Sequence, residues 1–395
     1  MQSRPSWVLP VIIFSQFAGT SLWFAGNAVL GDLQRQWGLA TEALGYATSA
    51  VQLGFITGTL AFAFFAVSDR WSPRNVFFLC SFAGALSNLG IYAFAEGFWS
   101  LLGFRFLTGF FLAGIYPVGM KIASGWYRSD LGNALGFLVG ALVLGTAFPH
   151  LLKGLGQQFP WETVMLAVSA VAALGGLLML ILVPDGPYLT KGAKFDPAAL
   201  AAIFRSRRFR ASAFGYFGHM WELYAFWAFV PFVLAAHSVQ RSPDLNISMW
   251  AFLVIAAGFL GCALGGIVSL RWGSARVAFA QLACSGLCCA ASPLFFDAPT
   301  GAFLAFLFFW GIVVVGDSPQ FSALNAQNAP RELVGSALTI GNCIGFSITI
   351  ASIQLLNSLA SSTSAAYLFL ALTPGPILGL IALWPLLRPA KDGTS

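Results

Sequence analysis

The sequence predicts an all-α integral membrane protein with twelve transmembrane helices in two pseudo-symmetric halves of six. Composition is the first observation behind this prediction: of 395 residues, 58% are hydrophobic and only 9% are charged, and the mean hydropathy is +0.80. A soluble domain carries roughly a quarter charged residues. The excess apolar surface must therefore face lipid.

The spacing of apolar runs is the second observation. A bilayer core about 30 Å thick needs about 20 apolar residues per helix. Twelve runs meet this need, at residues 7–30, 43–67, 75–95, 98–122, 132–153, 162–183, 211–236, 248–269, 276–296, 301–325, 334–358 and 364–387. The first run contains no small-residue cleavage site, so we expect a retained helix rather than a signal peptide.

The longest connection between runs, residues 184–210, separates the first six helices from the last six. We therefore expect an N-terminal half at 1–183, a linker at 184–210 and a C-terminal half at 211–395. Within the linker, Asp196-Pro197 is typical of a helix start. Residues 197–210 then predict a short amphipathic helix on the membrane surface, with its basic end near lipid headgroups.

The distribution of Lys and Arg predicts the orientation. With the N-terminus placed inside, the inside segments hold 16 of these residues and the outside segments hold 3. Positive charge favours the cytoplasmic side, so we expect both termini in the cytoplasm of a multi-pass protein of the cell membrane, most simply a bacterial inner membrane. The same placement explains the net charge of +6 without a nucleic-acid partner.

A short internal repeat supports two equivalent halves. Residues 128–135 (RSDLGNAL) match 331–338 (RELVGSAL) at Arg, Gly, Ala and Leu, and 114–117 (GIYP) parallels 316–319 (GDSP). The members of each pair lie six helices apart. Repeats of this kind are typical of secondary transporters.

The loop between predicted helices two and three, SDRWSPRNV (68–76), resembles the cytoplasmic signature of the major facilitator superfamily. Asp69, Arg70 and Arg74 match the pattern, while Phe65 and Ser72 stand where it has glycine. The equivalent loop of the second half, 266–277, is similar at Gly266, Arg271, Gly273 and Arg276, but Leu270 replaces the acid.

Two intramembrane patterns extend the resemblance. Arg105 followed by Gly109 is similar to the membrane arginine and glycine of helix four, and Gly136 and Gly145 are spaced like the first glycines of the antiporter motif, without its Gly-Pro end. The resemblance implies alternating access around a cavity lined mainly by helices one, four, seven and ten. It also implies a cytoplasmic gate at Asp69, Arg70, Arg74, Arg271 and Arg276.

Ionisable residues inside predicted helices are the leading site candidates: Arg105, Glu222, Asp317 and His219. Each charged group at a helix centre costs about 2.5–3.5 kcal/mol on insertion scales, so such residues mark functional sites. All four lie on helices four, seven and ten. We predict roles for them in proton coupling or substrate binding.

His219 and Glu222 are three residues apart and share a helix face, which Tyr216 and Phe226 extend. Glu222 is therefore a candidate proton carrier. Asp317 precedes Ser318-Pro319, where proline predicts a helix break; an acid there can bind a proton, a cation or an amine. Structural alternatives remain open: Arg105 as an ion-pair partner of an acid, and His219 as an interhelical hydrogen-bond donor.

Further side chains are candidates for the cavity wall: Gln16, Trp23, Asn27, Tyr216, Tyr224 and Gln320. Aromatic rings beside acids suit an amine through cation–π contact. Aromatic residues are 15% of the chain, however, and packing remains the alternative for each.

Several function classes lack their motifs in the sequence. There is no phosphate-binding loop for ATP and no nucleophilic triad, so we expect neither an enzyme nor a cofactor. The cysteines at 284, 288 and 289 fit helix packing better than a metal site. The proton gradient is the expected energy source.

The first hypothesis is a proton-coupled carrier of a small organic solute, expected to be a monomer whose partners are that solute and the lipid bilayer. The alternatives are an exporter of drugs or toxic compounds by proton antiport, and a membrane sensor or scaffold that does not transport.

Overall fold

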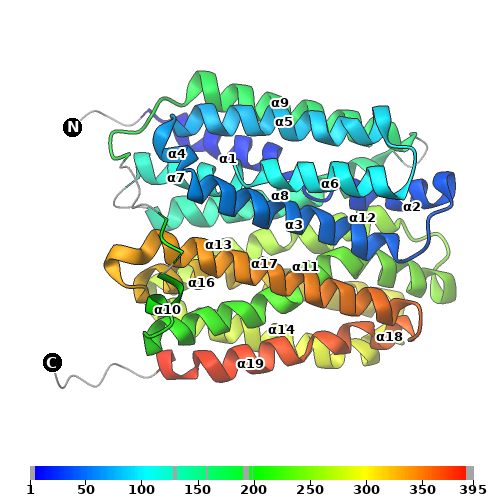
Figure 1. Ribbon diagram of the computed structural model, residues 1–395. Helices are drawn as coiled ribbons and strands as arrows, with labels where there is room; N and C mark the ends of the chain where they lie inside the picture. Colours follow the sequence, from blue (N-terminus) through cyan, green and yellow to red (C-terminus); the bar gives the residue numbers. More distant parts are fainter. Residues whose placement is uncertain (1–4, 128–130, 157–158, 190–194, 198, 388–395) are drawn as a thin grey trace.

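The chain forms a bundle of α-helices in a computed structural model, which describes residues 5–127, 131–156, 159–189, 195–197 and 199–387. Within that part, twelve helical spans are long and apolar enough to cross a membrane, as the sequence predicts. All run roughly parallel to one axis, and both termini lie at the same end (Figure 1). We call this the terminal end and the opposite one the distal end.

The first six spans comprise nine helices in the upper part of Figure 1. Their bounds are α1 Val8–Thr20, α2 Ala25–Trp37, α3 Ala43–Phe64, α4 Val67–Arg70, α5 Pro73–Phe94, α6 Phe98–Leu112, α7 Tyr116–Trp126, α8 Leu131–Leu155 and α9 Trp161–Leu182. Spans one and four are each built from two helices, α1 with α2 and α6 with α7.

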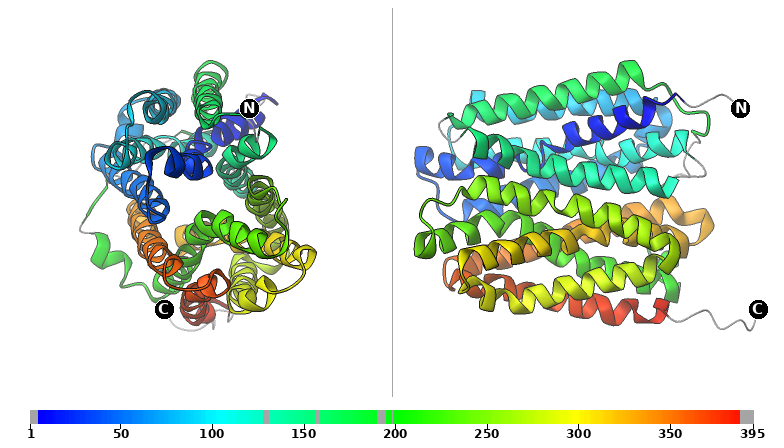
Figure 2. Two further views of the ribbon diagram at one scale, coloured as in Figure 1. Left: turned by 90° about the vertical axis from the view of Figure 1, so that its right-hand side faces the viewer. Right: turned by 180° about the vertical axis from the view of Figure 1, so that it is seen from behind.

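The last six spans occupy the lower part, and the view along the bundle shows the two sets facing each other (Figure 2). Their helices are α11 Arg207–Arg241, α12 Ile247–Ala256, α13 Gly258–Trp272, α14 Ser274–Phe296, α15 Thr300–Gly316, α16 Ser318–Asn328, α17 Val334–Ala360, α18 Ala365–Leu368 and α19 Pro374–Leu383, with 3₁₀ turns η1 Arg331–Leu333, η2 Phe369–Leu372 and η3 Trp384–Leu387. The boundaries of the two halves, at residues 183 and 211, stay a prediction.

The linker does not form the single amphipathic helix predicted over 197–210. Helix α10 is short, Ala199–Ile203, and the basic residues from Arg207 belong to α11, the seventh span. The interruption lies at Ser206, whose hydroxyl accepts a hydrogen bond from the backbone N–H of Phe209 at 3.2 Å. A side-chain acceptor at this position caps a new helix.

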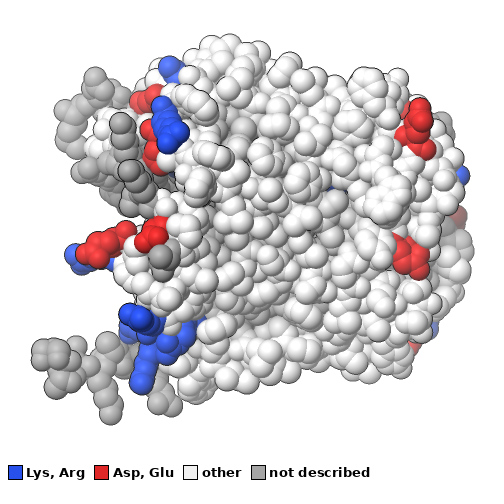
Figure 3. Space-filling model, viewed as in Figure 1, with Lys and Arg blue, Asp and Glu red and all other residues white. Residues whose placement is uncertain are grey.

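Charged side chains gather at the two ends of the bundle. Lys and Arg are prominent at the terminal end, and the middle of the visible face is predominantly white (Figure 3). Large apolar side chains cover the outside of the bundle, among them Leu264, Leu287, Leu294 and Ile381. This is the surface that a protein in a bilayer needs.

Helix breaks occur inside spans one, four, eight and ten. In span ten, α15 ends at Gly316 and α16 begins at Ser318 with a proline in its first turn, which confirms the break predicted at Asp317. In span four, α7 likewise begins with Tyr116-Pro117. Proline lacks the N–H that would continue a helix, so the paired motifs 114–117 and 316–319 produce the same local structure.

Candidate functional site

A cavity of about 700 Å³ lies between the first six spans and the last six. Its described lining comes from both sets, with Thr59 and Tyr116 on one side and Tyr216, Gln320 and Asn342 on the other. It extends along the wall to Ser269 and Ser274, around the turn between α13 and α14 at the terminal end. The cavity is therefore approached from the terminal end.

Aromatic rings close the inner end of the cavity. Tyr224 and Phe346 line it and lie 5.2 Å apart between ring centroids. Trp23 stacks on Phe346 at 5.6 Å and lies 5.6 Å from Tyr224, while Phe55 packs on Phe346 at 4.4 Å. Trp23 is not among the described residues that line the cavity, so it forms the layer behind the cavity wall rather than the wall itself.

Hydrogen bonds between the two sets of spans join them beyond this aromatic layer. The side chain of Asn357 accepts from the backbone N–H of Gly45 at 3.2 Å and donates to the carbonyl of Glu42 at 3.0 Å. Gln354 donates to Ser49 at 2.7 Å, and Gln52 donates to Thr349 at 3.2 Å. We call these contacts between α3 and α17 the distal amide closure.

Two faces of α11 have different surroundings. Tyr216, Met220, Leu223, Tyr224 and Trp227 line the cavity. The predicted face of His219 and Glu222 turns away from the cavity and into the interior of the last six spans, where both residues are fully buried.

Phe226 shares that interior face, since its ring lies 4.4 Å from Trp310. Tyr216 lies at the edge of this face: its ring is 6.1 Å from that of His219, as the spacing predicts, and it also lines the cavity.

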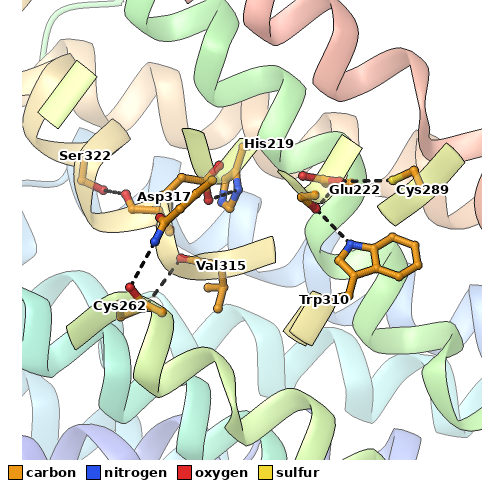
Figure 4. A network of polar contacts seen from close by, with 12 residues as sticks. His219, Glu222, Cys262, Cys289, Trp310, Val315, Asp317 and Ser322 are labelled. Carbon is orange, nitrogen blue, oxygen red and sulfur yellow. Dashed lines mark hydrogen bonds and ion pairs between the residues drawn. The ribbon is translucent and has the colours of Figure 1, made fainter. Parts of the chain in front are cut away.

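His219 and Asp317 form a fully buried pair just behind the cavity wall. The imidazole Nδ1 lies 2.8 Å from Oδ1 of Asp317, and the two side chains point toward one another (Figure 4). The contact has the distance of an ion pair, and within the described residues neither carboxylate oxygen of Asp317 accepts a hydrogen bond of standard geometry. Val315 and Ser318, which flank the break at Asp317, line the cavity.

Glu222 lies in a separate hydrogen-bond chain one helical turn along α11 (Figure 4). Ser285 donates to Oε2 of Glu222 at 2.8 Å and accepts from the indole N–H of Trp310 at 2.9 Å. The thiol of Cys289 is a second donor at 3.4 Å. The other oxygen, Oε1, has no hydrogen-bond donor in the described part of the chain.

Arg105 is fully buried among the first six spans, in the break between α1 and α2. Its guanidinium donates to the carbonyl of Leu22 at 3.3 Å, to the carbonyl of Trp23, and to Oδ1 of Asn27 at 3.2 Å. Breaking a helix frees backbone carbonyls that must find donors in a membrane. Arg105 supplies them, and no contact joins it to Glu222 or Asp317 within the described residues.

A glycine makes room for this arginine. A Cβ added at Gly26, in the first turn of α2, would lie 2.9 Å from Cδ of Arg105. The break itself coincides with two hydroxyls that bond back along the helix: Thr20 donates to Gln16 at 2.7 Å and Ser21 to Ala18 at 2.6 Å. Such bonds bend helices.

The remaining predicted cavity residues divide into two groups. Tyr216, Tyr224 and Gln320 line the cavity. Gln16 and Asn27 are not among the lining residues: Gln16 is fully buried without a partner for its amide, and Asn27 donates to Thr48 at 2.7 Å.

The predicted gate residues lie at the terminal end, where the cavity opens. Asp69 forms an ion pair with Lys121, which also donates to the carbonyl of Ser68 at 2.8 Å. Arg70, Arg271 and Arg276 are exposed and Arg74 is half-buried. Their role as a gate stays a prediction.

The cysteine cluster forms no metal site in the described part of the chain, where no group of three or more His, Cys, Asp or Glu side chains could hold a metal ion. The three thiols of the cluster are free, with Cys289 directed to Glu222. Packing and hydrogen bonding account for these residues.

Tyr116, Thr59 and Phe346 line the cavity but were not among the predicted site residues. The internal repeat could have identified Tyr116. This residue follows the break in span four, and the equivalent residue after the break in span ten, Ser318, also lines the cavity. Thr59 and Phe346 stand within uninterrupted apolar helices, where no local pattern distinguishes them.

Comparison with known families is decisive for the fold. The model described as Major Facilitator Superfamily matches residues 11–354. The chain belongs to this superfamily. Members of the superfamily are transporters rather than enzymes, and proton coupling and alternating access are typical of them. The assignment favours a transporter over a sensor or scaffold.

Individual relatives from this superfamily cover parts of the chain. The chain is 26% identical to a D-galactonate transporter of Escherichia coli over 162 residues, 40% of this chain and 37% of that protein. It is 36% identical to a multi-drug resistance efflux pump PmrA homolog of Lactococcus lactis over 120 residues, 30% of this chain and 28% of that protein. Each alignment thus spans well under half of the relative's length.

Solved structures share the fold over the whole chain. The proton:xylose symporter XylE superimposes with a TM-score of 0.74 at 12% identity, covering 97% of this chain and 96% of XylE. The human organic anion transporter MFSD10 gives a TM-score of 0.69 at 15% identity, covering 96% of this chain and 100% of MFSD10. At these identities the likeness establishes the fold alone.

Proposed function

We propose that this superfamily member is a secondary active transporter that couples the movement of an organic solute to the proton gradient. The observation that carries the proposal is the buried pair of His219 and Asp317, 2.8 Å apart at the break of span ten. Ionisable groups inside a membrane are characteristic of proton relays. The pair supplies a site where one proton can be gained or lost.

Coupling requires that the pair respond to the cavity. Asp317 is held between Val315 and Ser318, both of which line the cavity, so a change of cavity shape at the break moves the carboxylate directly. When water reaches the pair in one state and not in another, protonation differs between the states. Differential binding of the proton to two conformations is sufficient to shift the equilibrium between them.

We propose that the terminal end faces the cytoplasm of a bacterial inner membrane and that the structure is the inward-facing state. The support is the excess of Lys and Arg in the segments at that end, together with a cavity approached from there and a distal amide closure at the other end. Rocking of the six-span sets would then present the cavity to the opposite side. We expect the functional unit to be a monomer.

The experiment uses purified protein in liposomes that contain a pH-sensitive dye. Amines, carboxylates, sugars and drugs are added one at a time to wild type and to the Asp317→Asn, His219→Gln and Glu222→Gln variants. Asp244→Asn is the matched control, since Asp244 is an exposed acid at the distal side. Radiolabelled solute measures uptake independently of the dye.

A proton flux that accompanies one solute class, survives in the control and falls at least about tenfold in Asp317→Asn or His219→Gln supports the proposal. Solute uptake by wild type without proton flux, or flux unchanged in both variants, overturns it. A loss confined to Glu222→Gln would move the proton site to the chain of Glu222, Ser285 and Trp310.

Export of drugs or toxic compounds by proton antiport is the second candidate. The aromatic inner end of the cavity, at Tyr224 and Phe346, favours it, and one partial relative is named as a multi-drug efflux pump homolog. The direction of exchange decides between the two. An exporter raises the resistance of cells that carry the gene, whereas an importer raises accumulation of its solute.

A further inference from the structure

The central cavity presents no formal charge to a solute. None of the described residues that line it is Asp, Glu, Lys, Arg or His. Its hydrogen-bonding groups are neutral, mostly hydroxyls and amides, among them those of Thr59, Tyr116, Tyr216, Tyr224, Gln320 and Asn342.

Three ionisable groups buried inside the bundle are withdrawn from the cavity wall, while Lys121 and Arg271, which adjoin the lining residues Met120 and Leu270 toward the terminal end, are not among the described lining residues either. Asp317, His219 and Arg105 are each 0% exposed. The guanidinium of Arg105 is engaged by the oxygens of Leu22, Trp23 and Asn27, and His219 faces Asp317. None of the three offers a countercharge to an ion in the cavity.

An ionic solute would therefore lose hydration without gaining a group of opposite charge, and burial of an uncompensated charge is unfavourable. A neutral solute avoids this penalty. Hydroxyl and amide groups can donate and accept in the same site, which suits the hydroxyl, carbonyl or amide groups of an uncharged molecule.

The inner end of the cavity adds an aromatic surface of mutually inclined rings, with interplanar angles of 71° between Tyr224 and Trp227 and 53° between Tyr224 and Phe346. Trp227 and Tyr224 are 5.3 Å apart between ring centroids, and Tyr224 and Phe346 are 5.2 Å apart. Trp23 stacks behind Phe346 at an interplanar angle of 21° and holds that ring in place. Rings in this arrangement receive a planar group by offset or edge contact.

The size of the cavity further limits the class of solute that it can bind. Its volume of about 700 Å³ falls within the range of about 300–1,000 Å³ that accommodates drug-sized ligands.

We propose that the cavity binds an uncharged, amphipathic organic molecule with a planar apolar part. The planar part lies against Tyr224 and Phe346, and the polar part is hydrogen-bonded by Gln320 and by Tyr216 with Asn342, which contact each other across α11 and α17 at 3.2 Å. The inference rests on the proposed transport function and specifies its substrate class.

The test measures binding to purified full-length protein at pH 7. The probes are neutral aryl glycosides and aryl amides, each paired with a carboxylate and an amine analogue of the same size; phenyl glucoside, phenyl glucuronide and phenyl 6-amino-6-deoxyglucoside form one such set. Quenching of tryptophan fluorescence and the shift in melting temperature report binding. We expect neutral members of the panel to bind at least about tenfold more tightly than their charged analogues. Tighter binding of the charged analogues, or no binding by any neutral member, overturns the proposal.

A charge placed in the cavity provides a second measurement. Asn342→Asp preserves the size of the side chain, and we expect it to weaken binding of the neutral probe and to strengthen binding of its amine analogue by about tenfold, since a buried charge favours an opposite charge. Asn75→Asp is the control, because Asn75 is exposed near the start of α5. An unchanged order of affinities in Asn342→Asp would show that the probes bind elsewhere and would overturn the assignment.

The two proposals fail in different ways. Binding and uptake of neutral probes without proton flux would refute the coupling and leave the substrate class standing. Proton-coupled uptake of charged probes would refute the substrate class and leave the coupling standing.

Discussion

The breaks in span one and span ten contain buried charged groups of opposite kind. At the first, Arg105 donates to three oxygens that the interrupted helix and its neighbour present. At the second, Asp317 faces His219, and neither of its oxygens accepts a hydrogen bond of good geometry. A guanidinium that bonds several oxygens fixes one arrangement of the backbone, although Nε of Arg105 has no partner among the described residues. A carboxylate that faces one imidazole is the better candidate for proton exchange, so the comparison assigns a structural role to Arg105 and leaves the proposed functional role to Asp317.

The largest loss of stability is expected at the break in span one, where Arg105 bonds the freed carbonyls. Arg105→Ala leaves two buried carbonyl groups without a donor, at about 1–3 kcal/mol each, so the free energy of unfolding should fall by about 2–6 kcal/mol. Thermal denaturation in detergent measures it. Arg105→Lys keeps the charge but not the forked donor geometry. Its free energy of unfolding should therefore lie between those of wild type and Arg105→Ala. If Arg105→Ala is as stable as wild type, Arg105 does not have the structural role assigned to it here.

Ser285→Ala should have the next largest effect. It removes the donor to Glu222 and the acceptor of Trp310, and an unpaired buried polar group costs about 1–3 kcal/mol. The control is Ser269→Ala, whose hydroxyl bonds only within its own turn. Equal melting temperatures for the two variants would show that the chain at Glu222 contributes little to stability.

Asn357→Ala measures how much a contact between neutral groups contributes to closing the distal end. It removes the amide that bonds Gly45 and Glu42, each bond contributing about 0.5–1.5 kcal/mol net. We expect the distal end to open more often, which hydrogen–deuterium exchange at the distal ends of α3 and α17 would detect as a faster exchange rate. An unchanged rate would indicate that the aromatic layer at Trp23 alone keeps this end closed.

The smallest effect on stability is expected at Asp317, in the break of span ten. Asp317→Asn removes the charge without breaking a well-formed hydrogen bond, so the free energy of unfolding should change by less than about 1 kcal/mol while proton-coupled transport falls at least about tenfold. Thermal denaturation and the liposome assay on the same preparation measure both. A loss of stability as large as that of Arg105→Ala would show that Asp317, too, is structural.

Local sequence properties predicted the spans and one break. Length and hydropathy identified twelve spans because lipid requires a continuous apolar segment, and Pro319 identified the break at Asp317. The break at residues 21–24 contains no proline or glycine; its signals are the hydroxyls of Thr20 and Ser21 and an arginine that lies more than eighty residues away.

The orientation of α11 was beyond local prediction. This helix is apolar or aromatic on nearly every side and buried along most of its length, so no amphipathic pattern separates its cavity face from its interior face. The three-residue spacing correctly placed His219 and Glu222 together. Only the packing of α14 and α16 against α11 determines that this face looks inward.

The distal amide closure is built from neutral groups, at Asn357, Gln354 and Gln52. Moving one elementary charge across a membrane potential takes about 2.3 kcal/mol per 100 mV, whereas separating two amide partners moves no net charge. Opening of this end is therefore an electrically silent step, equally easy at high and low membrane potential. Under the proposed coupling, the proton carried by His219 and Asp317 is the charge whose movement would make the transport cycle depend on voltage.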